Sequence, residues 1–169
     1  MKIFETDRLL LRHLSLNDAG FILELLNSPS WLQFIGDRGV KNQGAACDYI
    51  LNGPLKMYAH LGFGLFLAEL KDNQIPIGIC GFLKREELTD VDIGFAFLPT
   101  YCGKGYAYES AVAMMKYGTT ALGFKRIAAI TVPENQSSIK LLEKLGMRFE
   151  KMVVDSNDNK EVMLFVSTA

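Results

Sequence analysis

Five consecutive residues, Gly103, Lys104, Gly105, Tyr106 and Ala107, combine features that suit an anion-binding turn. The two glycines allow the backbone to turn tightly and to approach a ligand closely. Apolar residues recur at helical spacing over residues 106–122, so the turn precedes a helix whose first amides are unpaired and whose dipole favours an anion. An ordinary strand-to-helix turn has the same pattern, and these residues alone leave both interpretations open.

Two common phosphate-binding motifs do not fit this turn. A Walker A loop requires Gly, four residues, Gly, Lys and then Ser or Thr, whereas here Lys104 lies between the glycines and Tyr106 follows the second. The dinucleotide fingerprint requires a third small residue, where Tyr108 stands, and an acidic residue about 20 positions later. Residues 121–132 contain no acidic residue. The turn is therefore expected to hold another phosphate-bearing ligand.

The residues before the turn, 91–98, alternate as a strand does. Bulky side chains occupy one face, whereas the other face carries a single carboxylate, Asp92, among Gly94, Ala96 and Leu98. This small-residue face leaves room for a ligand to lie over the strand.

Length and composition predict one cytoplasmic domain over residues 1–169. A net charge of −1 argues against direct nucleic-acid binding. The three cysteines, an odd number, indicate a reducing compartment, and their spacing does not suit a metal site. We expect no signal peptide, because the first 14 residues carry several charges, and no membrane span.

The elements that must position the turn form a mixed α/β pattern. Strands are expected at about 8–14, 64–70, 77–85, 91–98, 126–132, 147–154 and 161–167, and helices at about 18–26, 28–34, 42–61, 105–122 and 135–145. Gly53 and Pro54 are expected to kink or split the third helix, and Gly78 and Gly81 to mark a bend or a close backbone approach. The order predicts one central, mostly antiparallel sheet of about seven strands, parallel only beside the turn, with helices on both faces.

Three segments resemble the GNAT superfamily of N-acetyltransferases and, within it, the RimJ/RimL-like branch. The segments are ETDRLLLRHLSLNDA, VDIGFAFLPTYCGKGYAYES and ITVPENQSSIKLLEKLGMRFE, and the resemblance covers essentially the whole chain. It implies a GNAT-like fold and an enzyme that transfers an acetyl group from acetyl-CoA to a primary amine. It also implies that no metal ion takes part.

The resemblance assigns cofactor-binding roles to eight residues. It implies that the pyrophosphate lies on the amides of Gly103 to Ala107, that the pantetheine pairs with Phe97 and Leu98, and that Asn135 contacts the cofactor. Asn135 also suits the N-cap of a helix. One departure is Cys102, which stands where the family usually has Gln or Arg and is expected to weaken cofactor binding.

The catalytic residues are less plainly indicated. Many family members carry a tyrosine at the position of Leu142, whereas the RimL-like branch uses a serine that maps onto Ser138. Ser138 is the candidate acid for the departing thiolate, or else a small residue that lets the cofactor approach. Asp92 is the candidate base, with Glu69 as second choice, although a strand-edge carboxylate with no role is an equally open interpretation. The amide of Phe97 or Leu98 would polarise the thioester.

The acceptor is where the sequence says least. Branch resemblance favours a protein N-terminal α-amine and leaves a small amine open. Trp31, Phe34 and Tyr58 are expected to line the acceptor site, although Trp31 and Phe34 also suit the core. A homodimer is compatible with these features. A non-catalytic acyl-CoA sensor is the alternative function, because the tyrosine is missing.

Overall fold

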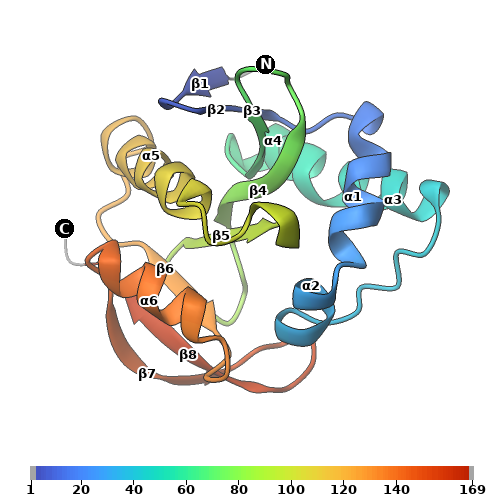
Figure 1. The fold of residues 1–169 in the computed structure, drawn as a ribbon. Helices are drawn as coiled ribbons and strands as arrows, with labels where there is room; N and C mark the ends of the chain where they lie inside the picture. The colour runs from blue at the N-terminus through green and yellow to red at the C-terminus, as the bar shows by residue number, and fades with distance from the viewer. Residues whose placement is uncertain (1–2, 168–169) are drawn as a thin grey trace.

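An eight-stranded mixed sheet with helices on both faces organises the chain (Figure 1). The computed structural model describes residues 3–167, so the first two residues of the N-terminal segment and the last two of the expected domain lie outside it. The strands are β1 (Ile3–Glu5), β2 (Leu9–His13), β3 (Leu65–Leu70), β4 (Pro76–Leu83), β5 (Asp92–Phe97), β6 (Ala128–Thr131), β7 (Arg148–Val154) and β8 (Glu161–Val166). The α-helices are α1 (Ala19–Leu26), α2 (Pro29–Phe34), α3 (Gln43–Ile50), α4 (Lys56–Leu61), α5 (Tyr106–Thr120) and α6 (Gln136–Lys144).

The predicted fold class is confirmed, with one strand more than expected. The strand order is β1-β2-β3-β4-β5-β6-β8-β7, and the β5–β6 pair is parallel while the other pairs are antiparallel. The additional strand is β1, whose three residues are too few to show a period-2 pattern. No helix within residues 3–167 combines the length and apolar character needed to cross a membrane.

The helix expected over 42–61 is interrupted where Pro54 lies. Residues Leu51–Leu55 form a π-helical turn between α3 and α4. Proline lacks an N–H, and its ring clashes with the carbonyl four residues earlier in a regular α-helix. The wider turn relieves this clash, so the interruption expected at Gly53 and Pro54 is confirmed.

β5 lies at the point where the sheet opens. Its parallel pairing with β6 is confined to Asp92 opposite Ala128, and beyond this position the two strands diverge. On its other side β5 pairs with β4, and the Leu98 N–H donates to the Ile77 carbonyl at 2.9 Å. Hydrogen-bonded pairs alternate along an antiparallel ladder, so the peptide groups of Ile93, Phe95 and Phe97 point away from β4, towards the opening beside β6.

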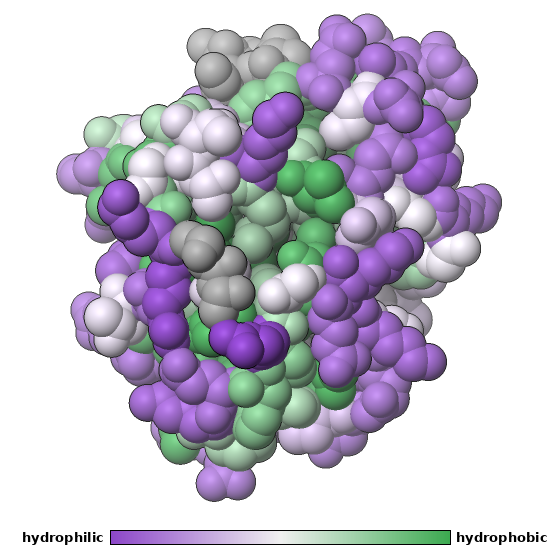
Figure 2. All heavy atoms as spheres, turned by 90° about the vertical axis from the view of Figure 1, so that its left-hand side faces the viewer, coloured by the Kyte–Doolittle hydropathy of each residue, from purple (hydrophilic) through white to green (hydrophobic). Residues whose placement is uncertain are grey.

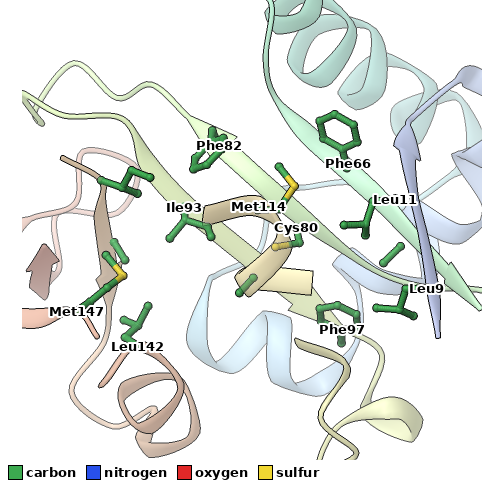
Figure 3. Packing of buried hydrophobic residues seen from close by; sticks show 14 of the residues in the cluster. Leu9, Leu11, Phe66, Cys80, Phe82, Ile93, Phe97, Met114, Leu142 and Met147 are labelled. Atoms are coloured by element: carbon green, nitrogen blue, oxygen red, sulfur yellow. The ribbon is translucent and has the colours of Figure 1, made fainter. Parts of the chain in front are cut away.

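The sheet separates two hydrophobic clusters. On the face covered by α5 and α6, Ile93 and Phe97 of β5 point into a cluster that also contains Phe82, Met114 and Leu142 (Figure 3). On the opposite face, α1, α2 and α3 pack over β3 and β4 through a second cluster that includes Trp31. Figure 2, which shows the left-hand side of Figure 1, has a band of apolar surface between hydrophilic side chains.

Two glycines in β4 allow the close approach that the sequence predicted. A Cβ on Gly78 would lie 2.3 Å from the ring of Phe97, and one on Gly81 would lie 2.2 Å from the carbonyl oxygen of Gly64. Neither position has room for a side chain, so both glycines keep β4 close to its neighbours.

Candidate functional site

The turn between β5 and α5 presents unpaired amides. Gly103 and Gly105 have φ angles of 75° and 84°, in the left-handed region that glycine adopts without strain. Gly105 is the N-cap of α5 and supplies no side-chain cap, and the Glu109 N–H donates to its carbonyl at 3.0 Å. The amides of Tyr106, Ala107 and Tyr108 precede this first helical bond and therefore have no partner within the helix. These three amides are therefore available to a ligand.

Arg8, which the sequence did not single out, braces the turn from the side. Its guanidinium donates to the Lys104 carbonyl at 3.1 Å and to a Glu109 carboxylate oxygen at 2.8 Å, and lies 4.2 Å from the centre of the Tyr106 ring. Thr6 also donates to Glu109. Burial alone would raise the pKa of Glu109, but the hydrogen bonds from Thr6 and Arg8 lower it. Arg8 thus donates to a carbonyl of the turn and leaves the amides of the turn unpaired.

A cavity of about 540 Å³ opens beside this turn. Such a volume is typical of small-molecule and cofactor sites. It brings together nine of the residues predicted for the site: Trp31, Phe34, Phe97, Gly103, Gly105, Tyr106, Ala107, Asn135 and Ser138.

A second cavity, of about 190 Å³, adjoins the first. Both are lined by Trp31, Phe34, Ile35, Phe95, Ala96, Asn135 and Ser138. The second cavity lies over Asp92, Gly94 and Ala96, so the room expected above the small-residue face of β5 is present. Two bound molecules in these cavities would therefore meet beside Ser138 and Phe95.

Asp92 is held in the wall of the smaller cavity by Arg85. The residue is 1% exposed, and the Nε of Arg85 lies 3.2 and 3.1 Å from its two carboxylate oxygens. Burial raises the pKa of Asp92 to about 6, while Arg85 opposes the rise. A carboxylate with a pKa near neutrality is suited to accepting a proton.

Asn135 and Ser138 lie where the two cavities meet. The side-chain oxygen of Asn135 accepts a hydrogen bond from the Ser138 N–H at 3.2 Å, so Asn135 is the N-cap of α6 as well as a cavity residue. The Ser138 hydroxyl makes no hydrogen bond to any residue within 3–167 and remains able to donate to a ligand.

Trp31 belongs to the core and to the site at once. It packs in the cluster beneath α1 and α3, as expected of a core residue, and it also lines both cavities. Its side chain is 6% exposed, and its indole N–H is buried without a hydrogen-bond partner among the described residues. An unpaired buried donor is unfavourable by about 1–3 kcal/mol.

The structure does not bring Tyr58 to either cavity. The π-helical turn leads into α4, where the Tyr58 ring stacks on His13 of β2 at 3.8 Å. Its hydroxyl accepts from the Leu14 N–H at 3.1 Å and donates to the Leu65 carbonyl. Tyr58 therefore joins α4 to the sheet and does not line the site.

Three other predicted residues also lie outside the cavities. Glu69 is paired with Arg12 at 3.2 Å, which removes it as a second base. The exposed Lys104 lies on the rim and lines neither cavity. The Leu98 side chain is buried, and its N–H is already donated to Ile77, so this amide cannot polarise a thioester.

The comparisons with known proteins agree with this geometry. A family model described as "Acetyltransferase (GNAT) domain" matches residues 8–148. The N-acetyltransferase p20 of Bacillus licheniformis is 30% identical over 157 residues, which cover 92% of this chain and 87% of that protein.

Two solved structures share the fold at low sequence identity. RimL, a ribosomal L7/L12 alpha-N-protein acetyltransferase in complex with coenzyme A, superposes with a TM-score of 0.84 at 16% identity, covering 99% of this chain and 98% of that one. A chimera of the spermidine N-acetyltransferase SpeG from Vibrio cholerae and hSSAT superposes with a TM-score of 0.76 at 19% identity, covering 95% of each chain.

Proposed function

Because the chain belongs to the GNAT acetyltransferase family, we propose that its two adjoining cavities bind acetyl-CoA and a primary amine together and that the amine attacks the thioester directly. The observation that carries this proposal is the junction of the cavities. One cavity begins at the unpaired amides of the turn, the other holds Asp92, and they meet at Ser138.

The turn is suited to the pyrophosphate of the cofactor. The amides of Tyr106 and Ala107 would donate to its oxygens at the positive end of α5, beside the Arg8–Glu109 ion pair that supports the turn. Each charge-assisted hydrogen bond contributes roughly 1.5–3 kcal/mol, and the dipole about 0.3–1 kcal/mol more.

The free edge of β5 is suited to the pantetheine. The peptide groups of Phe95 and Phe97 point into the opening beside β6. There they would form hydrogen bonds with the amides of the pantetheine. Phe95 lines both cavities, whereas Phe97 lines the larger one, so the Phe95 amide is the better-placed donor to the thioester carbonyl.

Asp92 would act as the general base, and Ser138 would stabilise the leaving group. Asp92 accepts a proton from the amine, and the Ser138 hydroxyl donates a hydrogen bond to the departing thiolate. An α-amine has a pKa of about 7.7–8.0 and loses its proton readily near neutrality, whereas a lysine side chain at about 10.4 requires roughly 4.6 kcal/mol at pH 7. One buried carboxylate with a raised pKa is therefore a sufficient base for an α-amine.

Turnover of acetyl-CoA tests the function directly. The purified protein is incubated with acetyl-CoA and a panel of peptides with free N-termini, amino acids and polyamines. Thiol release gives the rate and mass spectrometry identifies the product. We expect acceptor-dependent release of CoA and one acetyl group on the acceptor nitrogen.

The main alternative is a non-catalytic acyl-CoA sensor. Leu142, which stands at the family's tyrosine position, is 1% exposed and packs in the core, so it supplies no acid. Tight binding of acetyl-CoA in calorimetry, together with no acetylation of any acceptor, would favour the sensor and exclude the enzyme.

A further inference from the structure

The smaller cavity contains an excess of positively charged and hydrogen-bond-donating groups. Its charged residues are two arginines, Arg38 and Arg85, and a single acid, Asp92. Tyr49 and the Trp31 indole lie in the same wall. Burial raises the pKa of the Tyr49 hydroxyl, so this group stays neutral and able to donate.

Arg38 is the unusual member of this set. Arg85 lies against Asp92 at 3.1 Å and within 4.0 Å of Asp155, so its charge is balanced. Arg38 is half-buried, yet it forms no ion pair or hydrogen bond with the residues that the structure describes. The neighbouring carboxylate of Asp37 pairs with Lys41 instead, at 3.1 Å. A half-buried guanidinium without a counter-ion is expected to receive one from a ligand.

The buried N–H of Trp31 also lacks a partner. Trp31 lines the smaller cavity together with Arg38, and its indole nitrogen has no acceptor among the described residues. The Trp31 nitrogen is shielded from the cavity, so the guanidinium of Arg38 is the vacant donor that a ligand in the cavity could reach. A carboxylate pairs well with a guanidinium through two parallel hydrogen bonds, so the unpaired Arg38 indicates an anionic group on the acceptor.

The charge balance separates the acceptor classes. A polyamine would bring several positive charges next to Arg38, which forms no ion pair with a described residue. A peptide N-terminus has a neutral amide carbonyl where a free amino acid has its carboxylate. The unpaired charge of Arg38 favours the free amino acid over both.

The size and the remaining lining agree with a small molecule. A volume of about 190 Å³ corresponds to roughly six water molecules at about 30 Å³ each. Apart from the polar residues, Leu65, Ile79 and Leu83 form much of its wall. These residues suit an apolar side chain.

We propose that the acceptor is a free α-amino acid with an apolar side chain, whose carboxylate binds Arg38. This inference rests on the proposed function and names its substrate class. The amino nitrogen forms a bond to the acetyl carbon, the C–S bond of the thioester breaks, the nitrogen's proton passes to Asp92 and the thiolate accepts a hydrogen bond from Ser138. The products are an N-acetylamino acid and CoA.

Binding is tested first, independently of turnover. Trp31 is the single tryptophan of the chain and lines both cavities, so with CoA already bound its fluorescence reports further binding at the smaller cavity. L-leucine and L-leucinamide, which share the amine and the side chain and differ in the carboxylate, are titrated in the presence of CoA. We expect L-leucine to change the fluorescence with a dissociation constant at least about tenfold lower than that of L-leucinamide.

Arg38→Gln and Arg148→Gln form a matched pair of variants for both binding and kinetics. Arg148 is exposed, lines neither cavity and makes no ion pair with a described residue, so its replacement controls for the loss of one charge. In Arg38→Gln the preference for L-leucine over L-leucinamide is expected to disappear in both the dissociation constants and kcat/KM, whereas Arg148→Gln keeps it.

The outcomes distinguish this inference from the function on which it rests. Higher kcat/KM for N-terminal peptides or spermidine than for amino acids would overturn the inference and leave the acetyltransferase intact. An equal response to L-leucine and L-leucinamide, or a preference that survives in Arg38→Gln, would also overturn it. Selective binding of L-leucine without any acetyl transfer would overturn the proposed function and support the carboxylate site.

Discussion

At the scale of single residues, the environment of Asp92 sets its proposed chemistry. Removal from water disfavours the charged form, and the Arg85 guanidinium opposes this effect, which leaves the pKa of Asp92 at about 6. The carboxylate is thus mostly ionised at neutral pH, but it holds a proton more tightly than the carboxylate of a surface aspartate does. This balance depends on two side chains from neighbouring segments of the sheet.

Replacing Asp92 with Asn should remove the base. We expect kcat to fall by about a hundredfold, with little change in KM for acetyl-CoA. Asp92 is active when deprotonated, so the wild-type kcat should rise as the pH increases through about 6, and this inflection should vanish in Asp92→Asn. The exposed Asp72→Asn is the control, and a wild-type-like profile in Asp92→Asn would exclude Asp92 as the base.

Ser138→Ala tests the thiolate contact. The hydroxyl has no partner within the described part of the chain, so its removal leaves no buried group unsatisfied and should barely alter stability. We expect kcat with acetyl-CoA to fall by roughly tenfold, in line with the loss of one hydrogen bond to a charged group of about 1.5 kcal/mol. The exposed Ser156→Ala is the control, and unchanged kcat in Ser138→Ala would leave Ser138 as a residue that only permits close approach.

The residues that sequence reasoning found are those whose signal is local. Gly103 and Gly105 stand out through their spacing and Asn135 through its position at the start of a helix, whereas Ser138 was assigned from the family resemblance. Arg8 and Arg38 have no such signal, because tertiary contacts alone bring them to the turn and to the smaller cavity. Tyr58 was wrongly assigned to the acceptor site because the direction of a chain after a proline-containing π-turn cannot be derived from composition.

At the scale of elements, the site depends on how β5 passes into α5. The strand, the short 3₁₀ turn Pro99–Tyr101 and the two left-handed glycines reverse the chain so that the amides of α5 face the cavity. Arg8 and Glu109 connect this passage to the start of β2. The turn is therefore fixed from both sides before a ligand binds.

Gly103→Ala and Gly123→Ala separate backbone strain from cofactor binding. Both residues have similar left-handed φ angles, 75° and 73°, and a Cβ would meet no atom within 4 Å at either position. Each variant should lose about 1–2 kcal/mol of unfolding free energy. Only Gly103→Ala should also weaken acetyl-CoA binding in calorimetry, because Gly103 lines the larger cavity whereas Gly123 follows α5 at its other end. Equal cofactor affinity in the two variants would exclude the turn as the pyrophosphate site.

At the scale of the whole molecule, the proposed reaction takes place where the sheet opens. Its opening between β5 and β6 lies between the cluster under α5 and α6 and the cluster under α1, α2 and α3. The apolar patterns of the sequence were sufficient to predict most strands, and the strand–helix–strand order predicted the parallel pair. The insertion of β8 between β6 and β7 was not predicted, because strand order depends on long-range pairing that no local pattern records.

Cofactor binding should stabilise the whole chain. At a ligand concentration of 100 times the dissociation constant, linkage adds about 2.7 kcal/mol, which for a domain of this size raises Tm by roughly 5–10 °C. We expect this shift with acetyl-CoA in differential scanning fluorimetry and none with ATP or NAD at the same concentration. A comparable shift with either nucleotide would contradict the assignment of the turn to coenzyme A.

The divergence of β5 from β6 also determines how fast backbone protons exchange with solvent. The amides of Phe95 and Phe97 point into the opening, whereas those of Ala96 and Leu98 face β4. In the free protein, the amides of Phe95 and Phe97 should therefore exchange quickly, and those of Ala96 and Leu98 slowly. Acetyl-CoA should slow the exchange of Phe95 and Phe97 selectively, so that the cofactor acts as the missing neighbouring strand, and deuterium uptake followed by NMR would detect it.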